Sequence, residues 1–224
     1  MRSRRLSWAG LMLAIGLLGG TGPTEAQEAP VITDQVYHRG VDSAFALFAA
    51  GDHTEAERRF RLLIRHRPQE RRALFGLATI MAEMHRYEEA IDIFEQLVET
   101  SDRDHGSLNN LAWIYAAAED HRLRDGQRAI DLAQESLLLE PRQYYTWHTL
   151  ANAYHIMGRY LDALRALEEA IRYARRAEVD ATLLRRYERL RERIQLAHRI
   201  ERGFERAPDR RQLGLIVAMP DEDL

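Results

Sequence analysis

The sequence predicts an all-α fold, in which four helix pairs stack into an α-solenoid and a C-terminal helix caps the last pair. The main observation is a series of alanines, each within an apolar pattern of helical spacing: Ala56, Ala90, Ala129 and Ala163. The separations within this series are 34, 39 and 34 residues. A series of leucines has the same separations of 34 and 39: Leu77, Leu111 and Leu150. One structural unit is therefore repeated along the chain.

Length and composition agree with a folded domain and exclude several kinds of site. The 224 residues are 46% hydrophobic and 30% charged, and the net charge of −3 gives no strong field that would attract nucleic acid. The chain has no cysteine, which excludes disulfides and thiolate metal ligands. The sequence has no phosphate-binding glycine loop, nucleophile elbow or zinc-protease helix. We therefore expect no enzyme activity, no cofactor and no metal.

Residues 1–26 have the three-part layout of a secretory signal peptide. Arginines within the first five residues precede a mostly apolar run, 6–18, which is too short to span a bilayer comfortably. The small residues Thr24 and Ala26 offer a cleavage site before Gln27. We expect an exported protein, periplasmic in a bacterium first and secreted second, without a stable membrane span after cleavage. An uncleaved N-terminal anchor is the alternative.

After a linker, 27–36, the repeat region is predicted to span 37–174. Its units are approximately 37–70, 71–104, 105–143 and 144–175. Each unit is expected to form two antiparallel amphipathic helices. The fourth unit illustrates this, because Trp147, Leu150, Ala151 and Tyr154 follow the i, i+3, i+4, i+7 spacing of one helix face. Ala163 is small, as a close crossing of the two helices requires.

The motif of the fourth unit is Trp147-x2-Leu150-Ala151-x2-Tyr154, followed by Ala163-x3-Leu167. Two other units keep parts of it: Leu74-x2-Leu77-Ala78-x2-Met81 with Ala90-x3-Phe94, and Leu108-x2-Leu111-Ala112-x2-Tyr115 with Ala129-x3-Ala133 and Pro141. The first unit keeps Ala56-x3-Phe60 and Pro68, but its first helix is poor. This pattern resembles the tetratricopeptide repeat family. Asp102 and Arg175 stand where that family has proline, so the resemblance is incomplete.

The resemblance implies a right-handed α-solenoid, whose first helices line a concave groove that holds part of another protein. The stripe of these helices that faces the groove carries the candidate partner-binding residues: Phe45, Phe48, Arg72, Phe75, Thr79, Asn109, Asn110, Trp113, Tyr145, His148, Asn152 and His155. Aromatic rings offer rigid contact area, and exposed asparagines can pair with a peptide main chain. For Phe45, Phe48 and Trp113, packing against neighbouring helices is an equal alternative.

Two of these candidates also raise the question of a metal site. His148 and His155 lie seven residues apart on one face of a helix, and two histidines can begin such a site. No carboxylate stands at the i+4 position to complete it. We therefore interpret both as groove histidines.

The connection within the third unit is longer than the others. From Met81 to Ala90 is nine residues, whereas from Tyr115 to Ala129 is fourteen. The extra residues in 116–128 predict an elongated surface turn or one more helical turn through Ala116–Ala118. A partner contact through His121, Arg122 and Arg124 is the alternative.

The end of the chain differs from the repeats. A capping helix is predicted at 176–207, from apolar residues with alternating spacings of four and three: Leu183, Tyr187, Leu190, Ile194, Ala197 and Phe204. A dimerising coiled coil is the alternative. The outer face of this helix is expected to carry arginines: Arg185, Arg186, Arg189, Arg191, Arg193, Arg199 and Arg202.

The tail, 208–224, combines an apolar run with an acidic end. Leu213–Met219 is apolar and rich in strand-forming residues, and Asp221–Asp223 follows it. We expect this tail to dock on its own solenoid or on a partner.

These observations predict an exported, non-enzymatic adaptor that binds a peptide or protein segment in its groove, in envelope assembly, secretion or protein maturation. A self-associating scaffold, and hence a homo-oligomer, is the alternative. An enzyme accessory or metal-binding role comes third.

Overall fold

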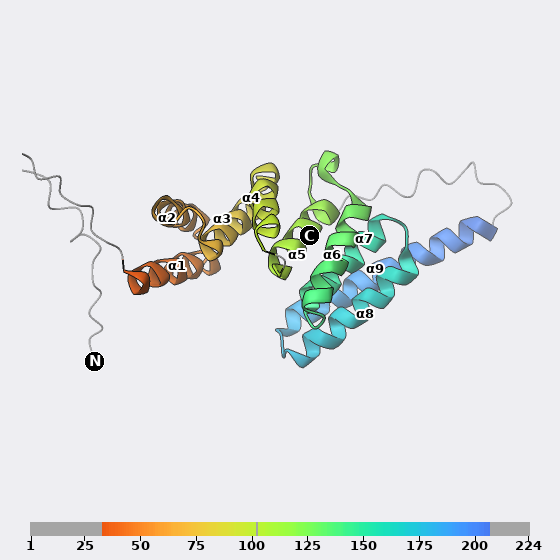
Figure 1. The fold of residues 1–224 in the computed structure, drawn as a ribbon. Helices are drawn as coiled ribbons and strands as arrows, with labels where there is room; N and C mark the ends of the chain where they lie inside the picture. The colour runs from red at the N-terminus through yellow and green to blue at the C-terminus, as the bar shows by residue number, and fades with distance from the viewer. Residues whose placement is uncertain (1–32, 102, 207–224) are drawn as a thin grey trace, which may run out of the picture.

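The computed structural model describes residues 33–101 and 103–206. The predicted signal peptide, 1–26, and the tail, 208–224, lie outside the described residues. Within them the chain is entirely helical, and the helices follow one another as antiparallel neighbours in an extended stack (Figure 1). The predicted all-α solenoid of helix pairs is therefore confirmed.

Four helix pairs and one long helix make up the described part of the chain. The helices are α1 (Asp34–Ala49), α2 (His53–His66), α3 (Arg71–Glu83), α4 (Tyr87–Glu99), α5 (His105–Ala117), α6 (Gly126–Leu139), α7 (Tyr144–Ile156), α8 (Tyr160–Arg176) and α9 (Ala181–Arg206). The short 3-10 helix η2 (His121–Leu123) lies between α5 and α6. Each first helix packs on its own second helix and on the next unit.

Local sequence explains where several of these helices begin and how they turn. Asp52, Asp104 and Asp125 each accept a hydrogen bond from the backbone N–H three residues later, which satisfies one of the free donors of a helix N-terminus. Gly51 and Gly158 have φ values of +81° and +71° in the turns inside the first and fourth units. Glycine adopts this left-handed region without the steric cost that a Cβ adds.

The core runs between the helices as one continuous cluster, and its repeat is that of the sequence. The four repeat-marking alanines are fully buried at the helix crossings: Ala56, Ala90, Ala129 and Ala163. Gly76 in α3 packs directly on the ring of Phe60 in α2, so closely that a Cβ on Gly76 would lie 2.3 Å from the ring Cζ. The second helix of the first unit can approach α3 only because residue 76 has no side chain.

The long connection in the third unit is a separate turn. Helices α3, α5 and α7 each have 13 residues, so the extra residues do not lengthen α5. They form η2 instead, where Asp120 accepts from the backbone N–H of Arg122 and Leu123 packs against the core. Arg124 Nε donates to the carbonyl oxygen of Ala118 at 2.7 Å, which ties the turn to the end of α5. Of the two shapes predicted for this connection, the structure has the elongated surface turn.

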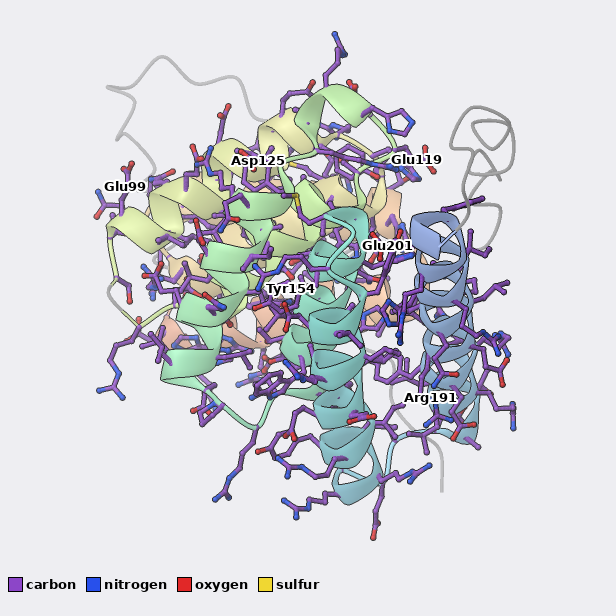
Figure 2. The ribbon with its side chains drawn as sticks, turned by 90° about the vertical axis from the view of Figure 1, so that its right-hand side faces the viewer. Glu99, Glu119, Asp125, Tyr154, Arg191 and Glu201 are labelled. Carbon is purple, nitrogen blue, oxygen red and sulfur yellow. The ribbon has the colours of Figure 1, made fainter. Side chains whose placement is uncertain are left out.

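Helix α9 is the cap that the sequence predicts. Tyr187, Leu190 and Ile194 are buried against the preceding unit, and α9 runs antiparallel beside α8 (Figures 1 and 2). Helix α9 has 26 residues and α8 has 17, so the C-terminal end of α9 projects beyond the stack (Figure 1).

Candidate partner-binding groove

Three of the predicted groove residues meet at the N-terminal end of the stack. Phe45 of α1 and Arg72 and Phe75 of α3 line an open hollow of about 500 Å³. The two rings are held from behind, because Phe45 packs edge-to-face on Phe60 with centroids 5.0 Å apart and Phe75 packs on Phe94 at 5.8 Å. Each ring is half-buried, so each stabilises the core and leaves one edge toward the hollow.

Arg72 brings a positive charge to this hollow. Its Nη2 lies 2.9 Å from Asp42 Oδ1, and its guanidinium carbon lies 5.9 Å from the centroid of the Phe45 ring. About half of each charged side chain is exposed, so water screens this ion pair. An incoming carboxylate could therefore compete with Asp42 for Arg72 at little cost.

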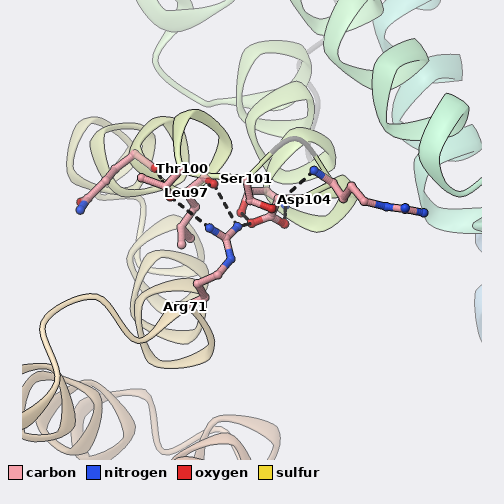
Figure 3. Close-up of polar contacts among 8 residues, drawn as sticks. Arg71, Leu97, Thr100, Ser101 and Asp104 are labelled. Atoms are coloured by element: carbon pink, nitrogen blue, oxygen red, sulfur yellow. Dashed lines mark hydrogen bonds and ion pairs between the residues drawn. The ribbon is translucent and has the colours of Figure 1, made fainter.

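A second arginine, which the sequence analysis missed, builds the wall of the same hollow. Arg71 Nη2 lies 2.5 Å from Asp104 Oδ2 and donates to the carbonyl oxygen of Leu97, and Arg71 Nη1 donates to Thr100 Oγ1 (Figure 3). Asp104 also accepts from the backbone N–H and the hydroxyl of Ser107, at 3.0 and 2.9 Å. One guanidinium thus joins the end of α4 to the start of α5 and fixes the edge of the hollow.

The middle of the predicted groove offers less to a ligand than expected. Asn109 in α5 is only 8% exposed, and its Nδ2 donates to Asn110 Oδ1 at 3.4 Å. The Asn109 Oδ1 atom is buried and has no hydrogen-bond partner among the described residues. Thr79 donates its hydroxyl proton to the carbonyl oxygen of Phe75, in its own helix. Of this set, Asn110 alone keeps a partly exposed amide.

The fourth unit shows the same departure. Asn152 in α7 is 8% exposed, and its Nδ2 is buried without a hydrogen-bond partner among the described residues. The expectation that Asn109 and Asn152 are exposed in the groove is therefore wrong. The reason is that α5 and α7 pack directly against each other, so part of the stripe lies at their interface.

The remaining aromatic candidates, Phe48, Trp113 and Tyr145, stay partly exposed, and the first two pack on the core. The ring centroids of Trp113 and Tyr87 are 6.4 Å apart, and those of Phe48 and His53 are 5.3 Å apart. Tyr145 packs edge-to-face on its neighbour Tyr144, and burial raises the pKa of its hydroxyl. These contacts agree with the packing alternative, and they do not test a role in binding.

His148 lies under the C-terminal helix. Its imidazole stacks on the ring of Tyr187 in α9, with centroids 4.5 Å apart and an angle of 13° between the planes. Burial, with a smaller contribution from the positive charge of Arg186, lowers the pKa of His148 to about 4. The imidazole is therefore neutral at physiological pH. Burial also raises the pKa of Tyr187.

The two groove histidines do not share one site. The ring centroids of His155 and Tyr160, at the start of α8, are 5.9 Å apart. His155 lies seven residues, about two turns, further along α7 than His148. Within 33–101 and 103–206, no group of three or more histidines, aspartates or glutamates could hold a metal ion. In the same ranges, no helix is long and apolar enough to cross a membrane.

Helix α9 contributes residues that the sequence analysis placed on an outer face. Arg186, Arg189 and Arg193 line a hollow of about 670 Å³ together with His148 and Tyr187. The spacing of arginines along the helix was visible in the sequence, but which side faces α7 depends on how α9 docks on the stack. The C-terminal end of the groove is therefore more cationic than predicted.

Two family models match the chain, and both describe a tetratricopeptide repeat. They cover residues 47–120 and 146–179. A comparison with curated protein sequences found no significant match.

Solved structures with the same fold include three proteins of low sequence identity. A thermophilic repeat protein of Thermus thermophilus is 22% identical, covers 77% of this chain and 92% of its own, and superposes with a TM-score of 0.59. MamA of Desulfovibrio magneticus is 13% identical over 80% of this chain and 99% of its own, with a TM-score of 0.51. A repeat protein of Parabacteroides merdae is 17% identical over 76% of this chain and 62% of its own, with a TM-score of 0.54.

Proposed function

The chain belongs to the tetratricopeptide repeat family, and on this premise we propose that it is an exported adaptor that holds a segment of a partner protein in its groove. The fold implies a role in protein–protein interaction or as a scaffold, and proteins built from these repeats are generally non-catalytic. Helices α1, α3, α5 and α7 would form the wall that the segment contacts.

The observation that carries this proposal is the hollow around Phe45, Arg72 and Phe75. Two half-buried rings flank an exposed guanidinium, and Arg71 with Asp104 holds the far edge in place. Such a site fits an apolar side chain between the rings and a carboxylate on Arg72. The segment that we expect here therefore carries an apolar residue next to an aspartate, a glutamate or a chain end.

Export is supported by the sequence of residues 1–26. A positive start, a short apolar run and a small-residue cleavage site are the parts of a secretory signal. The periplasm is the first assignment and secretion the second, with a function in envelope assembly, secretion or protein maturation.

The experiment begins with the capture of a partner from envelope extract and the mapping of its bound segment. Binding of that segment is then measured by calorimetry with the Arg72→Gln and Phe75→Leu variants. Each variant removes one contact of the hollow, so we expect affinity to fall about tenfold, which corresponds to the loss of about 1.4 kcal/mol. Asn110→Ala tests whether the groove continues toward α5.

Arg58 provides the matched control. It lies on α2, away from the hollow, and pairs with Glu55 at 2.7 Å as Arg72 pairs with Asp42. Arg58→Gln is expected to leave the affinity unchanged. Equal affinity for Arg72→Gln, Phe75→Leu and the original chain would contradict binding in this groove, whatever partner was captured.

A further inference from the structure

Helix α9 has a second face that its packing on α8 does not use. The buried face consists of Tyr187, Leu190 and Ile194. On an adjacent face, six side chains follow one another at spacings of three or four residues: Arg186, Arg189, Arg193, Leu196, Ile200 and Phe204. Residues three and four apart lie one above the other on a helix, so these six form a continuous stripe. We call it the α9 stripe.

The first half of the α9 stripe is cationic and has no acidic partner in the part of the chain that the structure describes. The structure shows no ion pair for Arg186, Arg189 or Arg193 with any described residue, although Arg175 pairs with Glu188 beside them at 3.2 Å. The three arginines line the hollow that also contains His148, which is neutral because of its lowered pKa. Three positive charges therefore face one open space.

The second half of the α9 stripe is apolar and exposed. Leu196 is 51% exposed and Ile200 is 36% exposed. Both lie between Arg191 and Glu201, which Figure 2 labels on α9, and thus toward the end of this helix that projects beyond the stack (Figure 1). Covering such side chains stabilises a protein by about 25 cal/mol for each Å² of apolar surface that is removed from water.

We propose that the tail of this chain, 208–224, folds back along α9 and occupies the α9 stripe. The tail lies outside the described residues, and its sequence provides the two kinds of group that the stripe lacks. Leu213–Met219 is apolar, and Asp221–Asp223 carries three acidic side chains. The apolar run would cover Leu196 and Ile200, and the acidic end would pair with the arginines.

The order of these groups matches the order on the helix. A chain that leaves the C-terminal end of α9 and turns back meets the apolar half of the stripe first and the cationic half second. The tail presents its apolar run first and its acidic end second. Residues 207–212, with Pro208, provide the length for the turn.

The spacing also matches. Along α9, the centre of the apolar half at Ile200 is eleven residues from the middle arginine, Arg189, which is about 16 Å at the rise of an α-helix. In an extended tail, the centre of the apolar run at Ile216 is six residues from Glu222, which is about 20 Å. Both halves can therefore be engaged at once without stretching the tail.

Tethering favours this occupant over an acidic segment from another protein. A segment joined by a short linker has an effective concentration on the order of millimolar at its site. Because His148 lines the same hollow, a docked tail would also cover the α7 end of the groove. That consequence rests on the proposed function, whereas the docking itself does not.

A distance measurement tests the docking in the full chain. The protein has no cysteine, so Glu192→Cys and Leu224→Cys place two spin labels without further changes. Double electron–electron resonance should give a narrow distribution of distances between the two labels, below about 20 Å, when the tail lies on α9. A free tail would give a broad distribution centred near roughly 30 Å, from the rise of the helix and the reach of a flexible chain.

Two sets of substitutions should abolish the short distance. The first is Asp221→Asn with Glu222→Gln and Asp223→Asn, and the second is Arg186→Gln with Arg189→Gln and Arg193→Gln. The control removes three arginines from other faces of the same helix: Arg191→Gln, Arg199→Gln and Arg202→Gln. It should keep the short distance, and circular dichroism checks that α9 stays folded in all three.

Three results would overturn the proposal. The first is a broad distribution in the otherwise unchanged chain. The second is equal loss of the short distance in the control, because the arginines would then act only through net charge. The third is loss of the short distance when labelled protein is diluted with excess unlabelled protein, which would show that the tail binds a second copy.

Discussion

At the scale of single residues, this fold depends on places where a small side chain is required. Gly76→Ala should destabilise the protein by about 2 kcal/mol, because the new Cβ would lie 2.3 Å from the Phe60 ring and the core must shift to accept it. Urea unfolding measures the change. Gly106→Ala is the control: its Cβ would lie 3.1 Å from Phe75 Cε2, so a small movement of that half-buried ring should suffice. Similar costs for both would contradict this account.

His148 links stability to pH. Its pKa is lowered to about 4 in the folded chain, from about 6.5 in an unfolded one, so the unfolded state binds more protons between these values. The stability that the neutral imidazole provides is therefore complete above pH 6.5 and is lost as the pH falls toward 4. Between pH 7 and pH 5 the loss should be about 2 kcal/mol.

The comparison of this chain with His148→Gln isolates that contribution. The variant loses the stack on Tyr187, so it should be less stable than the unchanged chain at pH 7. The test is the slope: the difference between the two free energies of unfolding should shrink as the pH falls from 7 to 5. A constant difference would contradict the lowered pKa.

Residues in one repeat unit were easier to place from the sequence than residues that join two units. The buried alanines and Phe60, Phe94 and Leu167 follow from helical spacing alone. The burial of Asn109 and Asn152 does not, because it depends on how closely α5 approaches α7. The bond between Arg71 and Asp104 spans 33 residues, and no local pattern indicates it.

At the scale of elements, the turns inside the first, second and fourth units each contain a residue with positive φ: Gly51, His85 and Gly158. Gly158→Ala should cost about 1 kcal/mol, since φ is +71° there and no neighbouring atom lies within 4 Å, so the cost comes from the backbone alone. Gly203→Ala, in the open interior of α9, should stabilise its helix by up to about 1 kcal/mol. Thermal unfolding measures both, and changes of the same sign would contradict this explanation.

The junction between α4 and α5 should depend on Asp104 in two separable ways. Asp104 caps α5 through the Ser107 N–H and pairs with Arg71. Asp104→Asn keeps an oxygen for the cap and removes the charge, so it should cost less than about 1 kcal/mol, whereas Asp104→Ala loses both and should cost about 1–2 kcal/mol. Chemical denaturation of both variants, and of each combined with Arg71→Gln, measures the two contributions.

The helices themselves were predictable because the motif fixes where each begins. The connection after α5 was predictable in length and not in shape, since the same extra residues could extend a helix or form η2. The structure forms η2 because Asp120 and Asp125 each accept a backbone N–H and thereby start a new element.

At the scale of the whole molecule, the groove has two ends with different chemistry. At the α1 and α3 end, Arg72 already has a carboxylate partner nearby in Asp42. At the α7 and α9 end, three arginines have no ion-pair partner among the described residues, and the tail carries three acidic side chains at Asp221–Asp223. This asymmetry suggests that the tail and a partner segment compete for the α9 end.

Removal of the tail should therefore strengthen the binding of a partner segment that reaches His148. If the tail covers the site in about nine molecules of ten, a chain that ends at residue 207 should bind that segment about tenfold more tightly. Calorimetry with both chains measures the ratio. The same truncation in the Arg186→Gln, Arg189→Gln and Arg193→Gln background should have no effect, because the tail no longer docks there. Equal affinity of the full and shortened chains would contradict competition by the tail, while a tenfold loss with Arg72→Gln would still support binding in the groove.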